Sequence, residues 1–168
     1  IPGIARVQPI AAPLEGGLLG VWGGFAPNTE TKPAQLAMNG ASYNAGCGTW
    51  TSLPVPTDAV GEEVFTGGAA AIAVPQKGVL VVGGVNKDVF LAAINKLPEG
   101  YLLHEPEWYR FNNKVLCYRQ GAWTQLLQHS SVARAGCALA YWDGWVYIVG
   151  GELKPGIRTS EIVRFRVD

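Results

Sequence analysis

The chain has 168 residues and a formal net charge of zero, and 48% of its residues are hydrophobic against 15% charged. This apolar content excludes a disordered chain and supports one domain with a sizeable core. Because the chain has neither a basic run nor a long apolar run, nucleic acid and membranes are both unsuitable partners. The 22 glycines, 11 prolines and six tryptophans favour short strands joined by many turns.

In chain order, the first predicted element is a hydrophobic strand at 18–24, Leu-Leu-Gly-Val-Trp-Gly-Gly, which ends in a pair of glycines. A short strand around Trp50 follows. A hairpin comes next, because a strand of small residues at 68–74 and an apolar strand at 79–84 flank a Gly-containing turn. The second strand of this hairpin also ends in Gly-Gly.

The same order of elements then repeats. Trp123 lies in a short strand, and a second hairpin joins a small-residue strand at 135–141 to an apolar strand at 145–151, which again ends in Gly-Gly. The last predicted strand, 160–167, is expected to be an outer one. This order resembles the kelch repeat, in which each repeat forms one four-stranded blade of a β-propeller.

The predicted fold class is therefore an all-β, kelch-type β-propeller, and residues 1–168 are expected to form about three blades of a six-bladed ring. An ordinary β-sandwich with Gly-rich turns is the alternative. Because three blades alone would expose two broad apolar faces, the remaining blades are expected from elsewhere. They come from a missing half of the same gene product, from a separate chain after cleavage, or from a second copy. The missing half is favoured, since the chain begins at Ile1 rather than at Met.

The connection after the second Gly-Gly predicts a short helical insertion near 88–110. Phe90, Ile94 and Leu97 recur at helical spacing, and Pro98 ends the helix. The apolar side of this helix is expected either to pack on a blade or to help wall a substrate pocket.

The spacing of Cys47, Cys117 and Cys137 matches no zinc or redox motif, so these residues are expected to be buried free thiols. His104 and His129 lie far apart and are expected to be surface or turn residues. Without a ligand-like cluster, the copper-radical chemistry of some kelch propellers is a poor interpretation, and no metal site is predicted.

The segment that follows the third Gly-Gly carries an acid and two bases in a turn made compact by Pro155 and Gly156. Glu152 and Arg158 can point into one space across this turn. Arg158 can hold a carboxylate with a bidentate fork, and Glu152 can transfer a proton. The alternative is that these charges serve only solubility or ion pairs between blades.

Two segments carry a resemblance to a known family. Residues 151–159, Gly-Glu-Leu-Lys-Pro-Gly-Ile-Arg-Thr, resemble Gly-Glu-Ala-Lys-Pro-Gly-Leu-Arg-Thr of the bacterial N-acetylneuraminate epimerases, or sialic acid mutarotases, which are six-bladed kelch propellers. Residues 83–90, Gly-Gly-Val-Asn-Lys-Asp-Val-Phe, resemble a second block of that family. The similarity covers about half of a family member, and relatives with a cyclically permuted blade order stay open as an alternative.

The resemblance implies that Glu152 and Arg158 are the catalytic pair and that Asn86 contacts the sugar. Arg134 precedes an inner strand, where kelch repeats often place an Arg; it either faces the central funnel and binds an anion or has a structural role. The insertion is much shorter here than in the family, so the pocket wall differs.

The implied function is interconversion of the anomers of N-acetylneuraminic acid, or a related sugar, by acid–base ring opening and closure without a cofactor. The family also implies a periplasmic or secreted protein, although the chain carries no signal peptide. Two alternatives stay open: a non-catalytic kelch module that binds a protein or a glycan, and lyase or oxidase chemistry on the same scaffold.

Overall fold

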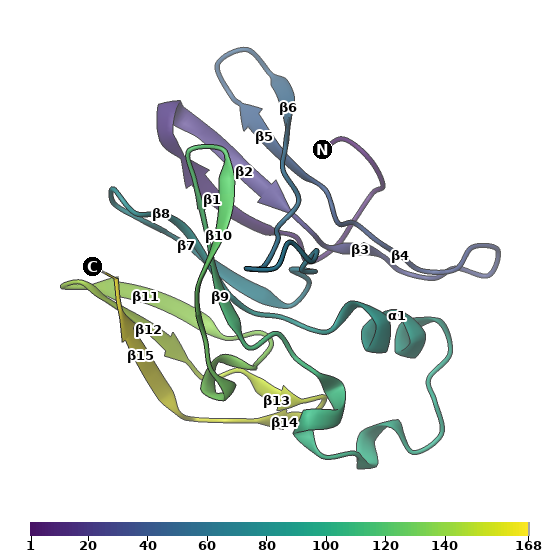
Figure 1. The fold of residues 1–168 in the computed structure, drawn as a ribbon. Helices are drawn as coiled ribbons and strands as arrows, with labels where there is room; N and C mark the ends of the chain where they lie inside the picture. Colours follow the sequence, from purple (N-terminus) through teal and green to yellow (C-terminus); the bar gives the residue numbers. More distant parts are fainter. Residues whose placement is uncertain (168) are drawn as a thin grey trace.

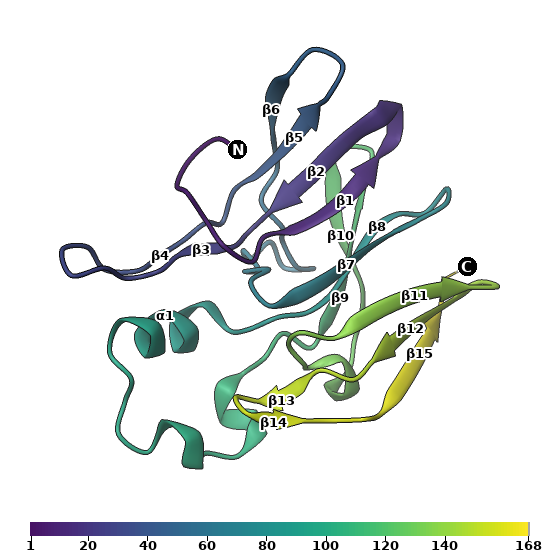
Figure 2. The same ribbon diagram turned by 180° about the vertical axis from the view of Figure 1, so that it is seen from behind.

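The computed structural model describes residues 1–167 as three antiparallel sheets that lie side by side as blades of a partial propeller (Figure 1 and Figure 2). From inner to outer edge, the strands are β1 (Ile10–Leu14), β2 (Leu18–Trp22), β5 (Gly40–Asn44) and β6 (Thr49–Leu53) in blade 1, β7 (Ala69–Val74), β8 (Gly78–Gly83), β9 (Lys114–Arg119) and β10 (Ala122–Gln128) in blade 2, and β11 (Ala138–Trp142), β12 (Trp145–Val149) and β15 (Ile162–Arg166) in blade 3. The inner strands contact one another in the order β1, β7, β11. The predicted all-β propeller is confirmed.

The position of blade 2 between two other blades explains why the strand at 79–84 has apolar residues on both faces and does not alternate between apolar and polar residues. Val79 and Val81 belong to a core shared with blade 1, whereas Leu80 and Val82 pack against blade 3. A sheet covered on both faces needs apolar side chains on both faces. Blade 3 differs, because alternate residues of β11 and β15 are exposed.

The first two Gly-Gly pairs lie close both to the lead-in segment of their own blade and to the lead-in segment of the next blade. Gly83 and Gly84 have φ angles of 71° and 106°, a region that glycine enters without strain. A Cβ on Gly83 would lie 2.1 Å from the carbonyl oxygen of Arg134 in the lead-in to blade 3. A Cβ on Gly84 would lie 3.1 Å from the carbonyl oxygen of Gly67, which leads into blade 2 itself. The pair therefore permits two close backbone contacts at once.

Tryptophan fills the junction between blades 1 and 2. Trp22 is fully buried, and its ring meets those of Trp123 and Tyr118 edge-on, with centroids 5.4 Å and 5.0 Å away. Trp123 Nε1 donates a hydrogen bond to the carbonyl oxygen of Pro54 at 3.1 Å. Trp50, in contrast, tilts against Tyr43 within its own blade.

Each blade carries an insert after its Gly-Gly pair, and all three inserts lie at the same end of the sheets (Figure 1). They are the hairpin β3 (Phe25–Ala26) and β4 (Gln35–Leu36), the helix α1 (Lys87–Asn95) with 3-10 turns at Tyr101–Leu103 and Pro106–Tyr109, and the hairpin β13 (Glu152–Lys154) and β14 (Ile157–Arg158). Two further 3-10 turns lie at Glu15–Gly17 and Ser130–Val132. The helix is shorter than predicted, because it ends at Asn95 and leaves Leu97 outside it.

Strand β15, expected to be an outer strand, takes the third position in its sheet, which β5 and β9 occupy in the other blades. Cys117 and Cys137 are buried free thiols whose pKa is raised by burial, but Cys47 is exposed, so that part of the cysteine prediction is wrong. Cys47 lies in a turn between β5 and β6, away from the core.

No helix within residues 1–167 has the length and apolar character needed to cross a membrane.

Candidate active site

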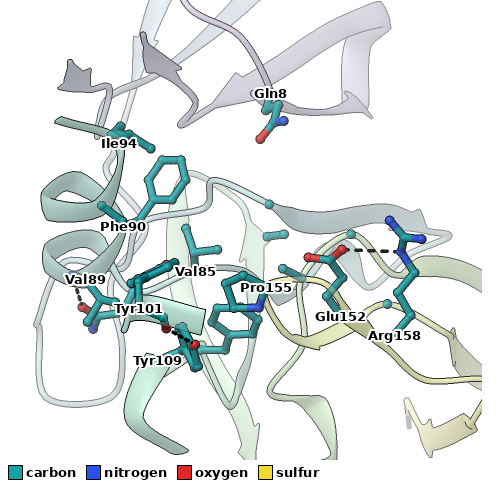
Figure 3. Close-up of a pocket in the computed structure, with 18 of the residues that line it drawn as sticks. Gln8, Val85, Val89, Phe90, Ile94, Tyr101, Tyr109, Glu152, Pro155 and Arg158 are labelled. Carbon is teal, nitrogen blue, oxygen red and sulfur yellow. Dashed lines mark hydrogen bonds and ion pairs between the residues drawn. The ribbon is translucent and has the colours of Figure 1, made fainter. Parts of the chain in front are cut away.

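A cleft of about 820 Å³ opens where the three blades converge, at the end that carries the inserts. Its floor is formed by the segments that lead into β1, β7 and β11. Its walls come from α1 with the following 3-10 turns and from the β13–β14 hairpin. Figure 3 shows the labelled residues of these walls facing one another across the cleft. The residues that line it include Gln8, Pro9, Gly68, Val85, Asn86, Val89, Phe90, Ile94, Tyr101, Tyr109, Phe111, Ala135, Glu152, Pro155 and Arg158.

Glu152 and Arg158 form a cross-strand pair in the β13–β14 hairpin. Arg158 Nε lies 3.5 Å from Glu152 Oε1, and the two side chains are 81% and 34% exposed, respectively. An ion pair this open to solvent is weak, so the guanidinium can leave it at little cost. Within residues 1–167 the terminal nitrogens of Arg158 form no hydrogen bond, which leaves the fork available to an anionic ligand.

The hairpin that carries this pair is fixed at two places. Glu152 exchanges two backbone hydrogen bonds with Ala135, at 2.7 Å and 3.0 Å. These bonds pair the start of the hairpin with the segment that leads into β11. Lys154 Nζ donates a hydrogen bond to the carbonyl oxygen of His104 at 2.6 Å, which ties the hairpin to the insertion. No local sequence pattern predicts this second contact, because it joins segments 50 residues apart.

Asn86 lies in the same cleft, at the start of α1. Its Oδ1 accepts hydrogen bonds from the backbone nitrogens of Asp88 and Val89, both at 3.1 Å, and so caps the helix. The cap occupies the side-chain oxygen, which leaves the amide nitrogen as the group of Asn86 suited to contact a ligand. The structure therefore brings Asn86, Glu152 and Arg158 together.

Arg134 does not join them. It is 1% exposed, and its guanidinium donates hydrogen bonds to the carbonyl oxygens of Ser131 and Gly150. Arg6 forms the same kind of contact in blade 1, with its Nη1 3.3 Å from the carbonyl oxygen of Gly23. Each arginine thus donates a hydrogen bond to the first glycine of a Gly-Gly pair. Arg134 therefore belongs to the structural frame, meaning the blades and the segments that join them, and does not line the cleft.

Tyr101 and Tyr109, from the two 3-10 turns that follow α1, also line the cleft. The Tyr109 hydroxyl donates a hydrogen bond to the carbonyl oxygen of Tyr101. Burial, and secondarily the neighbouring Tyr109, raise the pKa of Tyr101, so its phenol is neutral at neutral pH. His104 stacks on Trp108 at a centroid distance of 3.9 Å. No group of three or more His, Cys, Asp or Glu side chains within residues 1–167 is arranged to hold a metal ion.

The chain is similar to proteins of one known family. The model of the N-acetylneuraminate epimerase family matches residues 1–168. The chain is 30% identical to N-acetylneuraminate epimerase of Haemophilus influenzae (strain PittEE) over 95% of this chain and 44% of the relative. It is 27% identical to the protein of that name from Salmonella typhi over 97% of this chain and 44% of the relative.

A solved structure of YjhT superposes with a TM-score of 0.81 at 24% identity, and it covers 98% of this chain and 50% of that chain. The likeness to YjhT supports the propeller fold. The chain spans less than half the length of the curated relatives that it matches. Because the family model matches the whole chain, this chain belongs to the N-acetylneuraminate epimerase family.

Proposed function

We propose that this chain forms the catalytic part of a sialic acid mutarotase, which interconverts the α and β anomers of N-acetylneuraminic acid. One observation carries the proposal. Glu152 and Arg158, an acid–base residue and an anion-binding residue, lie 3.5 Å apart in a cleft at the convergence of the blades. This pair stands in the segment that resembles the family's active-site motif.

The reaction needs two proton transfers. The anomeric hydroxyl loses its proton to the Glu152 carboxylate while the ring oxygen gains a proton, and the bond between the anomeric carbon and the ring oxygen breaks to give an open-chain ketone. Closure on the other face of the ketone reverses both transfers. The proton at the ring oxygen comes from water or from a residue of the rest of the ring.

Arg158 fits the position of the sugar's carboxylate. In N-acetylneuraminic acid the carboxylate is attached to the anomeric carbon. A guanidinium fork that holds this carboxylate places the anomeric hydroxyl beside Glu152 and stabilises the negative charge that develops during ring opening. The weak ion pair between the two residues therefore opens when the substrate carboxylate arrives.

The activity belongs to a complete ring, and the proposed source of the other blades is the rest of the same protein. Blade 3 has an uncovered face on which Trp142 and Ile162 are exposed by 74% and 63%, and a further blade is expected to pack there. Native mass spectrometry of the purified protein tests this. A longer polypeptide that is monomeric supports the proposal, whereas a dimer of two three-bladed copies contradicts it.

We also propose a periplasmic or secreted location, which the resemblance to the epimerase family implies. Fractionation of the source cells tests a periplasmic or secreted location. Recovery of the protein only with cytoplasmic markers contradicts it.

The activity is tested by anomer exchange of N-acetylneuraminic acid, followed by NMR on the complete protein. Glu152→Gln is expected to slow exchange by about 100-fold, because the carboxamide cannot accept the proton. Arg158→Ala is expected to raise KM more than Glu152→Gln does. Glu107→Gln, an exposed acid outside the cleft, is the matched control and retains wild-type exchange. Wild-type rates in both site variants, or tight binding of sialic acid without acceleration by the wild type, would favour a non-catalytic glycan-binding propeller.

A further inference from the structure

The two sides of the cleft differ in chemical character. Glu152 and Arg158 make one side charged. The facing side is formed by α1, and Figure 3 shows Phe90 and Ile94 on this side, across the cleft from Glu152. The helix residues that line the cleft are all apolar, namely Val89, Phe90, Ala93 and Ile94. Val85, which follows the second Gly-Gly pair, extends this apolar surface towards the floor. We call these five residues the apolar wall.

The apolar wall is held in place at three points. The Phe90 ring meets Phe25 edge-on at 4.9 Å and stacks over Phe65 at 6.1 Å. Asn86 caps the start of the helix. At the other end, Asn95 Oδ1 accepts a hydrogen bond from the backbone nitrogen of Ala34, in the β3–β4 insert, at 2.7 Å. Because the wall is fixed before any ligand binds, a ligand loses little free energy in ordering it.

A sugar that spans this cleft needs an anionic group at one end and an apolar substituent at the other. N-acetylneuraminic acid has this arrangement, because its carboxylate and its acylamino group are attached at opposite positions of the six-membered ring. When Arg158 holds the carboxylate, the acyl group projects across the cleft towards α1. Transfer of its methyl group from water to an apolar surface is favourable.

We infer that the apolar wall is the subsite for the N-acyl group of the sugar, and that Val89 and Ile94 set the preference among N-acyl substituents. This inference rests on the proposed sialic acid substrate. An acetyl methyl lies against the wall, whereas a glycolyl group would bring a hydroxyl there without a hydrogen-bonding partner. A sugar with a hydroxyl in place of the acylamino group leaves the wall unfilled.

The test compares three sugars on the complete protein: the N-acetyl, the N-glycolyl and the deamino forms of sialic acid. Wild-type kcat/KM for anomer exchange is expected to be about fivefold higher for the N-acetyl than for the N-glycolyl form, since desolvation of the glycolyl hydroxyl without a hydrogen-bonding partner costs about this factor. Ile94→Ser is expected to remove this preference, and Ile94→Val to retain it. Leu103→Ser, at a site that is 82% exposed and outside the cleft, is the matched control.

Calorimetric binding of the same three sugars separates the possible failures. If binding follows the wall but the wild type does not accelerate exchange, the mutarotase proposal fails and the subsite stands. If the wild type exchanges anomers but Ile94→Ser, folded by circular dichroism, keeps the wild-type order of the three sugars, the subsite is wrong and the proposed function stands. Equal kcat/KM values of the wild type for all three sugars also overturn the subsite.

Discussion

The hairpins β3–β4 and β13–β14 occupy the same position in blades 1 and 3. Phe25 and Glu152 each follow a Gly-Gly pair, and each forms a backbone bridge to the lead-in segment of its own blade. Across the hairpins, Phe25 pairs with Leu36 and Glu152 pairs with Arg158. The backbones agree, but the chemistry does not. In blade 1 the position carries two apolar residues, and in blade 3 it carries an acid and a base.

The two pairs serve different ends. Phe25 packs against Phe90 and so supports the helix that walls the cleft, whereas Glu152 faces the cleft itself. The comparison shows that the repeated backbone determines where a pair of side chains is placed, and the residue types determine whether it supports the site or belongs to it.

The largest expected difference between the two positions is in stability. Phe25→Ala is expected to lower the free energy of unfolding by about 2 kcal/mol, because a half-buried ring is lost from its contact with Phe90. Glu152→Ala is expected to change it by less than about 0.5 kcal/mol, since its ion pair is open to solvent. Denaturant unfolding of the two variants measures both values. Equal losses would show that Glu152 has a supporting role like that of Phe25.

A smaller effect is expected from Lys154, which has no counterpart in the β3–β4 hairpin. Lys154→Met removes the hydrogen bond to His104 and frees the hairpin from the insertion. On the proposed function, the expected result is about a tenfold lower kcat/KM for anomer exchange, because misplaced catalytic groups react slowly, with partial recovery in Lys154→Arg. The thermal midpoint and the pH profile are expected to stay unchanged. A shifted pH profile would instead mean that Lys154 exchanges a proton with the substrate.

The smallest expected effect is on stability at acidic pH. It arises from Asp58, in the segment that joins blade 1 to blade 2, and its contact with Lys114 in β9. The hydrogen bond from Lys114, together with backbone donors of Glu62 and Val60, lowers the pKa of Asp58. A carboxyl whose folded pKa lies below its unfolded value of about 3.9 stabilises the fold above that pH and loses this contribution as pH falls through the folded pKa.

Thermal melting between pH 7 and pH 3 measures this contribution. The wild type is expected to lose stability below about pH 4, and Asp58→Asn to show a smaller loss over the same range from a lower starting value. Asp143→Asn, in an exposed turn, is the control and should follow the wild type. An identical pH dependence in Asp58→Asn and the wild type would contradict the role of Asp58.

The arrangement of the blades could be predicted from the sequence, because Gly-Gly pairs, small-residue strands and tryptophans recur in the same order and each reflects a local structural requirement. The same recurrence would have identified Arg134 as structural. Arg6 stands at the same spacing before β1 as Arg134 before β11, and a residue repeated in two blades belongs to the frame. Asn86 also fits a helix-cap pattern before Lys87.

The residues of the cleft could be predicted from the sequence only in part. Glu152 and Arg158 lie within one short segment, so their meeting follows from a single turn. The contact of Lys154 with His104 and the packing of Phe90 on Phe25 join different inserts, and no local pattern encodes them. The exposure of Cys47 likewise depends on where the turn between β5 and β6 lies in the whole blade.

The common position of the three inserts has a consequence for how such a protein can change. Duplication of a blade also duplicates its Gly-Gly pair. The new pair provides another position for an inserted loop at the same end of the sheets, next to the inserts of the other blades. A new loop inserted there meets its neighbours without any alteration of the strands beneath. Exchange of the segment between the Gly-Gly pair and the third strand, from one blade to another or from a relative, is therefore a route to new ligand specificities that keeps the scaffold intact.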